Sequence, residues 1–399
     1  MSSGLRIVVT GLIGQYPLGG VAWDYVQYVV GLARLGHDVY YLEDTGQWPY
    51  NPEEGGVSKG PEVTVGHLEG LMSRFGLEER WAYRFPWGPR WFGMPESRRQ
   101  EVLASADLLV NVSGTLERPA EYRDAAPRAR FAYLDSDPVF TQVKLVRGQQ
   151  DFRRLVDAHD VHFSFGEALA HTVPDTGHRW RPTRQPVVLD EWEPAPTRRE
   201  AFTTVMNWTS YRPVRWHGLS LDQKDVEFER FLDLPRKVQP TVLEVALAEG
   251  KTRQPPRDRL SAAGWRIVDP SLVCPDPESY REYVAGSTAE WSVAKNGYVD
   301  PPSGWFSCRS ACYLACARPV VLQDTGFSSV LPVGVGLLPF SSLDEATEAI
   351  REVESDWSRH SRAARAIAEQ CFDSARVLNR LVAEAMDGDR PDVPVGASR

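Results

Sequence analysis

Two aspartates separated by one residue stand where a strand is expected to end. Asp135 and Asp137 follow the apolar run Phe131–Leu134, with Ser136 between them and Pro138 after them. Two carboxyl groups this close can raise one another's pKa, which would make one of them a better general base near neutral pH. Because Asp137 before a proline is also a natural helix N-cap, Asp135 is the stronger candidate for catalysis. The same triplet fits a pattern that holds a divalent metal ion.

A glycine-rich segment, Gly11–Gly20, follows the first expected strand, Leu5–Thr10. Its glycines let backbone amides approach a ligand, and it leads into an expected helix at Val21–Leu35, whose N-terminus would favour an anion. The spacing does not fit G-x-G-x-x-G, so a nicotinamide cofactor is not supported. A turn built only for close helix packing is the alternative.

A second candidate anion site lies in the segment 304–321. Ser307 is a good N-cap, and the amides of the following turn, with Arg309 and Ser310 beside them, would cradle a diphosphate. Lys295, just after the expected strand Trp291–Ala294, is a second cation that would meet the phosphates. An ordinary capped helix and a solvated lysine are the alternatives.

The loop Gln323–Phe327 carries groups that suit a sugar. Asp324 and Thr325, followed by Gly326, are placed to bond sugar hydroxyls, since a carboxylate can accept from two hydroxyls at once. An Asx turn that only stabilises the loop is the alternative.

Two of these segments carry a resemblance to a known family. Gly19-Gly20 with Leu32–Val39 resembles the opening of family-four-type GT-B glycosyltransferases, and the segment 304–321, with its Pro319-Val320-Val321, resembles their donor-binding segment. The resemblance implies an α/β protein of the GT-B type, with two Rossmann-like parallel-sheet domains facing each other across a cleft. The donor-binding residues that it implies are Gly19, Gly20, Lys295, Trp305, Phe306, Ser307, Arg309, Ser310, Asp324, Thr325 and Gly326.

The chain departs from the family pattern at one place. Many retaining members carry two glutamates with seven residues between them, and the corresponding residues here are Gly304 and Cys312. We therefore favour an inverting reaction, which needs a general base to take the proton of the acceptor hydroxyl. Asp135 and Asp137 are the expected catalytic residues. The other candidate bases are Asp24, Glu43 and Asp44.

No metal site is expected. The D-x-D metal pattern belongs to GT-A enzymes, which lack two successive α/β lobes. Cys308, Cys312 and Cys316 fall on one helix face, and a straight stripe cannot wrap a tetrahedral zinc ion, so we expect these thiols to pack in the core. The expected co-substrate is a nucleotide sugar, with UDP-glucose the leading donor, and no other cofactor is expected.

Aromatic side chains are frequent in the first half of the chain. Tyr16, Trp87 and Trp91 are expected to line an acceptor pocket, because aromatic faces stack on planar groups. A flat ring system or a nucleoside-like molecule would fit such a pocket. Ordinary packing of a loop-rich insert is an equal alternative.

The elements that must position these residues follow an alternation of β-branched runs and helix-period segments, which predicts parallel sheets. Ten strand-like runs are Leu5–Thr10, Asp38–Leu42, Asp107–Val112, Phe131–Leu134, Val161–Phe165, Phe202–Asn207, Thr241–Leu247, Trp265–Val268, Trp291–Ala294 and Pro319–Leu322. Helices are expected at Ser342–Glu354 and Arg359–Ala385. We divide the chain into an acceptor-binding domain (1–190), a linker (191–200), a nucleotide-sugar-binding domain (201–371), a helix packing back on the first domain (372–388) and a flexible tail (389–399).

Composition excludes several classes of protein. A length of 399 residues suits two domains, and a formal net charge of −9 argues against a nucleic-acid-binding surface. No apolar run approaches about 18 residues, and no signal peptide is evident, so neither a membrane span nor export is expected. Five cysteines make no disulfide framework and suit a reducing compartment. We expect a cytoplasmic monomer or homodimer.

These observations favour a metal-independent glycosyltransferase that moves a hexose from a nucleotide sugar to a hydroxyl of a small acceptor, such as a natural product or nucleoside of secondary metabolism. A nucleotide-sugar 2-epimerase, which turns over the donor without an acceptor, is one alternative. A non-catalytic sugar-nucleotide binding protein is another.

Overall fold

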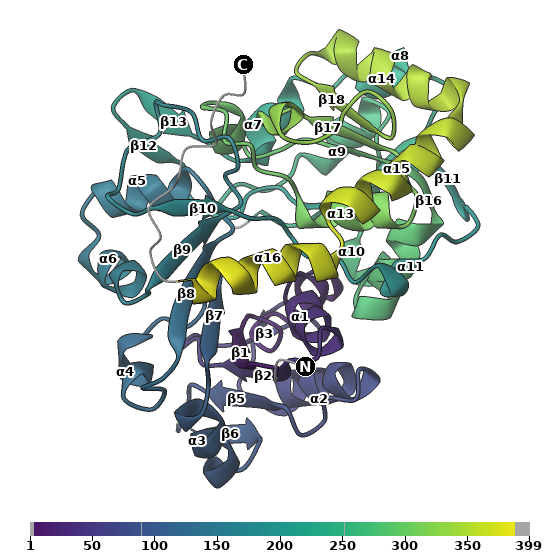
Figure 1. Ribbon diagram of the computed structural model, residues 1–399. Coiled ribbons are helices and arrows are strands. Elements are labelled where there is room, and N and C mark those ends of the chain that lie inside the picture. The colour runs from purple at the N-terminus through teal and green to yellow at the C-terminus, as the bar shows by residue number, and fades with distance from the viewer. Residues whose placement is uncertain (1–3, 89, 251, 388–399) are drawn as a thin grey trace, which may run out of the picture.

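Two parallel β-sheets organise the protein. The computed structural model describes residues 4–88, 90–250 and 252–387. An eight-stranded sheet with its helices forms what we call the first domain, and a six-stranded sheet with its helices forms the second domain (Figure 1). The two domains bring together the loops in which the candidate site residues lie.

The first sheet has the strand order β10-β9-β8-β7-β1-β2-β5-β6. All neighbours pair in parallel except β6, which returns antiparallel to β5 at the edge. Its central strands are buried along nearly their whole length, as expected where helices cover both faces of a parallel sheet. The bounds are β1 (Arg6–Thr10), β2 (Asp38–Glu43), β5 (Trp81–Phe85), β6 (Arg90–Gly93), β7 (Leu108–Val112), β8 (Arg130–Asp135), β9 (Val161–Ser164) and β10 (Trp180–Pro182).

The second sheet has the order β15-β14-β11-β16-β17-β18, all parallel. In chain order this is 3-2-1-4-5-6, the arrangement of a doubly wound nucleotide-binding sheet. The bounds are β11 (Arg199–Asn207), β14 (Leu243–Ala248), β15 (Arg266–Val268), β16 (Ser287–Ser292), β17 (Val320–Gln323) and β18 (Leu337–Phe340). β16 ends two residues before the predicted strand does, which leaves Val293 and Ala294 in the loop that leads to Lys295.

Helices and two small hairpins complete both domains. The first domain contains α1 (Gly19–Arg34), α2 (Glu62–Arg74), α3 (Glu96–Ala104), α4 (Ala120–Arg123), α5 (Phe140–Val146), α6 (Gln150–Asp157) and the hairpin β3 (Tyr50–Asn51) with β4 (Gly56–Val57). The second contains the hairpin β12 (Val214–Trp216) with β13 (Leu219–Leu221), and α7 (Lys224–Glu229), α8 (Leu234–Lys237), α9 (Arg257–Ala262), α10 (Pro270–Val273), α11 (Pro277–Gly286), α12 (Asn296–Val299), α13 (Cys308–Ala315), α14 (Leu343–Ser355) and α15 (Trp357–Cys371). Short 3-10 turns lie at Leu189–Glu191 and Phe327–Ser329.

The chain returns to the first domain at its end. The single helix predicted over Arg359–Ala385 is instead two helices, because Phe372 pairs its carbonyl with the amide of Val187 and Asp373 caps the next helix. That helix, α16 (Ser374–Met386), lies against α1, and a Cβ at Gly31 of α1 would stand only 2.5 Å from Leu378 (Figure 1). The predicted tail, 389–399, lies outside the described residues.

The connection between the domains is well packed. β11 begins at Arg199, inside the linker predicted at 191–200. Trp192 is completely buried there, 4.9 Å between ring centroids from Trp23 of α1 and 6.3 Å from Tyr280 of α11. The connecting segment is therefore anchored to both domains by one indole ring.

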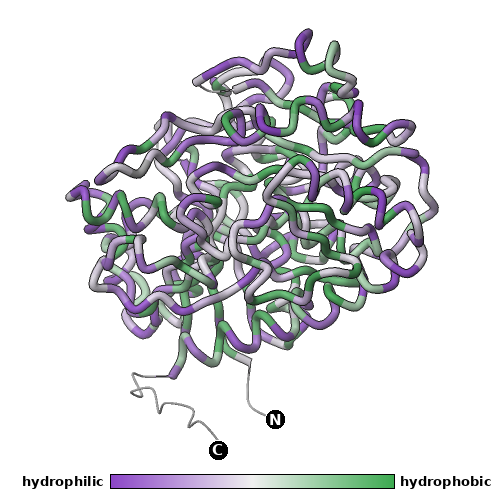
Figure 2. Tube along the Cα trace, turned by 90° about the horizontal axis from the view of Figure 1, so that it is seen from above, coloured by the Kyte–Doolittle hydropathy of each residue, from purple (hydrophilic) through white to green (hydrophobic). Residues whose placement is uncertain are grey.

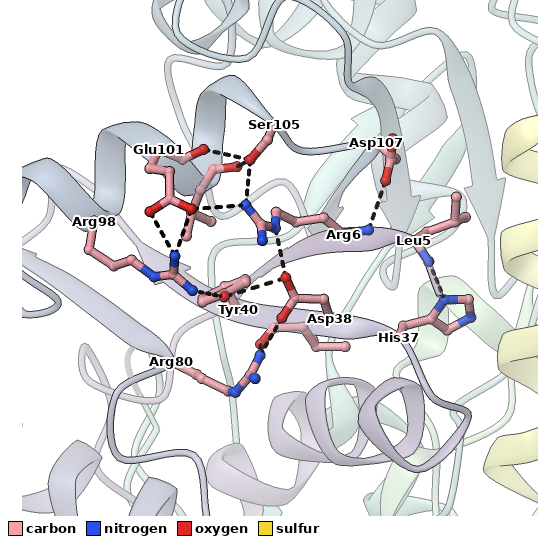
Figure 3. Close-up of polar contacts among 12 residues, drawn as sticks. Leu5, Arg6, His37, Asp38, Tyr40, Arg80, Arg98, Glu101, Ser105 and Asp107 are labelled. Atoms are coloured by element: carbon pink, nitrogen blue, oxygen red, sulfur yellow. Dashed lines mark hydrogen bonds and ion pairs between the residues drawn. The ribbon is translucent and has the colours of Figure 1, made fainter. Parts of the chain in front are cut away.

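An ion-pair network closes the amino-terminal edge of the first sheet (Figure 3). Asp38 at the start of β2 accepts from Arg6 of β1 at 2.7 Å and from Arg80 at 2.5 Å. Arg6 also donates to Ser105, just after α3, and its amide donates to Asp107. The network lies at the edge opposite to the loops that follow the strands, so it stabilises the sheet without contributing to a ligand site.

Hydrophobic segments lie towards the middle of the molecule, and hydrophilic segments line its rim in the view of Figure 2. The largest cluster of buried apolar side chains spans both domains and includes the α1, α11, α13 and α16 helices. None of the helices in the described ranges combines the length and the hydrophobicity that a membrane crossing requires.

The start of α1 presses against the second domain. A Cβ at Gly19 would lie 2.3 Å from the carbonyl oxygen of Asp276, which caps α11, and one at Gly20 would lie 3.2 Å from the ring of Tyr280. Trp23 reinforces this contact by donating from its indole nitrogen to the carbonyl of Pro277 at 2.7 Å. The absence of a side chain at Gly19 is what permits this approach of two backbones.

Replacing Gly19 by alanine tests this contact. Gly19→Ala forces the backbones of α1 and α11 apart, and we expect the free energy of unfolding to fall by about 2 kcal/mol in chemical denaturation. Gly66→Ala is the matched control, because its Cβ would meet nothing within 4 Å in the middle of α2. That variant should gain about 0.5–1 kcal/mol. Equal effects of the two substitutions would refute the close approach.

Candidate functional site

The candidate site lies where the order of each sheet reverses. The reversal falls between β1 and β7 in the first sheet and between β11 and β16 in the second. Ligands of open α/β sheets bind beyond the carboxyl ends of the strands at such points. Lys295 follows β16 closely and Asp137 follows β8, and the two side chains meet between the domains.

Asp137 is held by three donors from the second domain. Lys295 Nζ lies 2.9 Å from its Oδ1, Tyr211 donates to its Oδ2 at 2.7 Å, and the Tyr298 hydroxyl donates to Oδ1. Burial alone would raise the pKa of Asp137, but Lys295, Lys144 and the tyrosine hydroxyls outweigh it and lower the pKa. The prediction that the aspartates raise one another's pKa is therefore wrong for Asp137.

The alternative interpretation of Asp137 as a helix N-cap is also wrong. α5 begins at Phe140, and its N-cap is Val139, whose amide donates to Gln142 Oε1 at 2.6 Å. The carboxylate of Asp137 is turned away from that helix towards Lys295. The chain uses the proline turn to present Asp137 to the second domain.

Asp135 has a different environment from Asp137. Its side chain is 1% exposed and accepts from Thr141 Oγ1, Gln142 Nε2, Ser164 Oγ and the amide of Asp137 at 2.7–3.1 Å. Burial raises the pKa of Asp135, although these donors counteract it. With both oxygens engaged, Asp135 holds the loop after β8 and has no free lone pair directed at a substrate. This geometry favours Asp137 over Asp135 as the group that reaches a ligand.

Three basic side chains, Lys224, Lys295 and Arg309, lie near one another at the switch point of the second sheet. Arg309 bonds Glu290 at 2.5 Å, the carbonyl of Val205 at 2.9 Å and Ser292 Oγ at 2.7 Å. Its guanidinium is thus anchored on β11 and β16 and is not free to rotate towards a ligand. Donor binding by Arg309 stays a prediction, in which its fixed positive charge would act on the phosphates.

Lys224 is the residue that the sequence interpretation missed. Burial, together with the charges of Arg309 and Lys295, lowers the pKa of Lys224 well below its usual value. Within the described ranges, its ammonium group has no hydrogen-bond or ion-pair partner. The available signal was position: Lys224 opens α7, where the helix dipole disfavours a cation.

The first turn of α13 faces the same region. Ser307 occupies the N-cap position of α13, as predicted, but its side chain makes no capping bond, and the buried hydroxyl of Ser310 has no partner in the described part of the chain. Trp305 stacks on Tyr298 at 4.4 Å and donates to the carbonyl of Ser136 at 3.2 Å. Phe306 instead points into the core, stacked on Phe372. The loop before α13 therefore also contacts the loop that carries Asp137.

The glycine pair at the start of α1 lies against the second domain. Gly19 and Gly20 pack on α11, and donor binding by them stays a prediction. The part of α1 beside α13 is further along the helix: Asp24 lies against Cys308, and Gln27 Nε2 lies 3.9 Å from Cys312 Sγ. The physical reason is the close approach of α1 and α11, which the small glycines permit.

Two further candidate bases have distinct environments. Burial raises the pKa of Asp24 to about 7, and the charge of Arg309 and a bond from Cys308 only partly offset it. Burial likewise raises the pKa of Glu43 to about 7. Glu43 accepts from the amides of Gly14 and Gln15 and from the Tyr41 hydroxyl at 2.5–2.8 Å, so it shapes the loop before α1.

The predicted sugar-binding loop is an Asx turn in this structure. Asp324 accepts from the amide of Gly326 at 2.8 Å and from Ser328 Oγ at 2.5 Å, and Thr325 donates to the carbonyl of Trp305. These bonds tie the loop after β17 to the loop before α13. Sugar binding by Asp324, Thr325 and Gly326 stays a prediction.

The three predicted acceptor residues do not share one surface. Trp87 is 71% exposed and pairs with Trp48, and Tyr16 pairs with Tyr50. Trp91 instead packs on the side of the sheet that carries α3, with the guanidinium of Arg99 4.1 Å from its ring centroid. Trp91 lies in β6, whereas Trp87 lies in the turn before it, so the two indoles are held by different parts of the hairpin.

No metal-binding arrangement is present in the described residues, in which no group of three or more histidine, cysteine or carboxylate side chains could hold an ion. Asp135 and Asp137 of the D-x-D triplet face different partners, as described above. Cys312 and Cys316 are buried, Cys308 is partly buried, and all three thiols are free.

Comparisons with known proteins identify the fold. No protein-family model matches the chain, and no curated protein matches it. Among solved structures, HepE of Anabaena in complex with UDP-glucose is 15% identical at a TM-score of 0.58, over 95% of this chain and 98% of that chain. Sucrose-phosphate synthase from Thermosynechococcus elongatus is 12% identical at 0.54, over 95% and 98%. AviGT4, a glycosyltransferase involved in avilamycin A biosynthesis, is 14% identical at 0.53, over 96% and 97%.

The chain thus has the GT-B fold, and the fold class predicted from the sequence is confirmed. The similarity extends over both domains and the final helix, since nearly all of each chain is covered. The two-domain architecture is shared with these structures.

The buried carboxyl of Asp24 predicts a specific pH dependence of stability. Because its folded pKa of about 7 exceeds the unfolded value of 3.8, the folded state holds a proton that the unfolded state releases between these values. The free energy of unfolding should fall as pH rises through this window and level off above about 7. Asp24→Asn cannot titrate and should show a shallower slope in urea denaturation at pH 5, 6 and 7. An unchanged slope would contradict this, and Asp344→Asn, whose side chain is 82% exposed, is the control.

Asp135 and Asp137 should differ in how much each contributes to the free energy of unfolding. Asp135→Ala leaves several buried donors without an acceptor, and we expect a loss of about 3 kcal/mol in the free energy of unfolding. Asp137→Ala should cost less, because its donors lie at the partly exposed domain interface, where side-chain exposure is 25% for Asp137. A larger loss for Asp137→Ala would reverse the structural assignment.

Proposed function

We propose that this protein transfers a hexose from a UDP-sugar, with UDP-glucose as the leading donor, to a hydroxyl group of an acceptor. The observation that carries the proposal is the gathering of three basic side chains at the switch point of the second sheet, where Lys295 and Arg309 are fixed by their bonds and Lys224, at the start of α7, has no hydrogen-bond or ion-pair partner in the described residues. Burying an unpaired ammonium is costly unless an anion completes the site. The similarity of the fold to HepE with bound UDP-glucose supports the choice of a nucleotide diphosphate as that anion.

The diphosphate would occupy the space between these cations and the first turn of α13. Lys224 and Lys295 would neutralise the phosphate oxygens, and the free amides of α13 with the Ser310 hydroxyl would donate to them. Arg309 would contribute its fixed positive charge. Because lysines supply the charge that a metal ion supplies elsewhere, we propose a metal-independent reaction.

In the proposed transfer, the acceptor hydroxyl oxygen forms a bond to C1 of the sugar while the bond from C1 to the β-phosphate oxygen breaks. UDP leaves with the electron pair of that bond, and the acceptor proton passes to a carboxylate. We assign this proton to Asp137, the partly exposed member of the pair. Once phosphates draw Lys295 away, the pKa of Asp137 rises and its carboxylate becomes a better base.

Lys224 gives a test in which two readouts move in opposite directions. Lys224→Ala removes a buried unpaired charge, so the melting temperature without ligand should rise or stay equal. The same variant should bind UDP at least about tenfold more weakly, because it loses a charge-assisted contact to phosphate. Isothermal titration with UDP, without added metal and again with EDTA, measures the affinity.

The control is Lys237→Ala, on α8, where the lysine pairs with Asp344 at 3.1 Å on an exposed surface. It should leave UDP affinity unchanged. If wild-type protein fails to bind UDP, or binds it only with added Mg²⁺, the proposed donor site is wrong.

Transfer itself is measured by mass spectrometry after incubation with UDP-glucose and a panel of acceptors. A mass increase of one hexose on an acceptor, with release of UDP, is the expected result. Conversion of a UDP-sugar without any acceptor would indicate an epimerase. Binding of UDP-sugars without transfer or slow hydrolysis would indicate a binding protein.

A further inference from the structure

Four aromatic side chains form a row along one edge of the first sheet. Tyr16 lies in the loop after β1, Trp48 and Tyr50 lie beyond the end of β2, and Trp87 lies in the turn after β5. β1, β2 and β5 are parallel neighbours in the sheet, so these loops stand side by side at its carboxyl edge. We call these four residues the aromatic row.

The rings of the row form two pairs. Trp87 and Trp48 lie 5.5 Å apart between ring centroids, and Tyr50 and Tyr16 lie 6.4 Å apart. Pro49 alone separates Trp48 from Tyr50, and the amide of Tyr50 donates to the carbonyl of Gln15 at 2.7 Å. This hydrogen bond therefore fixes the segment that carries Trp48 and Tyr50 to the loop that leads into α1.

The outer end of the row is open to solvent. Trp87 is 71% exposed and Trp48 is 41% exposed. Single exposed apolar residues are ordinary, but two exposed indoles in mutual contact leave an apolar surface without a protein partner. Phe85 packs edge-to-face against Trp48, with 5.9 Å between their ring centroids, and this contact holds the Trp48 ring in place.

Polar groups beside the row indicate what covers it. Gln47 and Glu117 are both exposed, and the amide of Gln47 donates to the Glu117 carboxylate at 2.7 Å next to Trp48. Asp44, which is buried just after β2, is held by Arg84 and by the Tyr122 hydroxyl. Exposed aromatic faces bordered by carboxylate and amide groups suit a hydroxyl-rich molecule with apolar ring faces, namely a sugar.

The charge beside the row disfavours a membrane surface. Binding to anionic lipid uses lysine and arginine around the inserted aromatic groups. Here the exposed side chains next to Trp48 are an amide and a carboxylate, and the nearby Arg84 is neutralised by Asp44 at 3.0 Å.

We propose that the aromatic row binds the acceptor as a chain of sugar units, with the outer units on Trp87 and Trp48 and the reacting end near Tyr16. This inference rests on the proposed function and names the substrate class of its acceptor side. Tyr16 stands in the loop that ends at Gly19, and α1 continues from there to Asp24 beside α13, so the row leads towards the proposed donor site. Two pairs of rings, spread over the loops that follow three neighbouring strands, fit an extended glycan better than one flat ring system.

The experiment uses the full chain on an array of immobilised oligosaccharides of one to six units. The expected result is binding to glycans of two or more units, reduced about tenfold in Trp87→Ala and restored in Trp87→Phe, which keeps an aromatic face. Leu272→Ala, at a leucine that is 81% exposed in the second domain, should bind as the wild type does.

The UDP affinity of the same proteins separates this inference from the proposed function. Trp87→Ala should bind UDP as the wild type does, since Trp87 lies in the turn between β5 and β6. Retained UDP binding with no glycan bound, or glycan binding that is unchanged in Trp87→Ala, overturns the aromatic row alone. Trp87-dependent binding to phosphatidylglycerol vesicles, with no glycan bound, would replace it with a lipid surface. Loss of UDP binding in the wild type overturns the proposed function instead.

Discussion

One carboxylate connects the two domains at the point where a ligand is expected. Asp137 extends from the first domain into a group of donors from the second, formed by Lys295, Tyr211 and Tyr298. Removing a charge from water is costly, so a partly buried aspartate requires such partners. Because Lys295 is also one of the cations proposed to meet a diphosphate, the same residue links domain contact, carboxylate pKa and donor binding.

The second domain carries more positive charge at its switch point than its carboxylates offset. One oxygen of Glu290 bonds Arg309 while the other has no hydrogen-bond partner, and Lys224 is unpaired among the described residues near this carboxylate and two other basic side chains. An unpaired basic group away from water lowers the stability of the folded state, so stability alone does not account for Lys224 at this position. The cost is understandable if an anionic ligand occupies the site during the reaction.

Much of the site could be predicted residue by residue, but its pairings could not. The triplet Asp135-Ser136-Asp137 was recognisable because it follows a buried strand, yet which aspartate faces the other domain depends on Tyr211 and Tyr298. Arg309 was expected to contact phosphate, yet its pairing with Glu290 depends on a different element of the fold, the strand β16. Lys224 lay in a segment without any motif. Partners from distant parts of the chain decided each of these cases.

The sequence by itself determined the two α/β domains, their parallel sheets and the segments in which the site lies. It did so because buried parallel strands and the helices between them leave local periodic patterns of apolar residues. Only the tertiary structure decided that Gly19 packs on α11 and that Asp135 spends its hydrogen bonds on the loop after β8. It also decided that Trp87 and Trp91 lie in different surroundings. These outcomes depend on close approaches and on the direction of side chains across strands and domains, for which a single sequence carries no periodic signal.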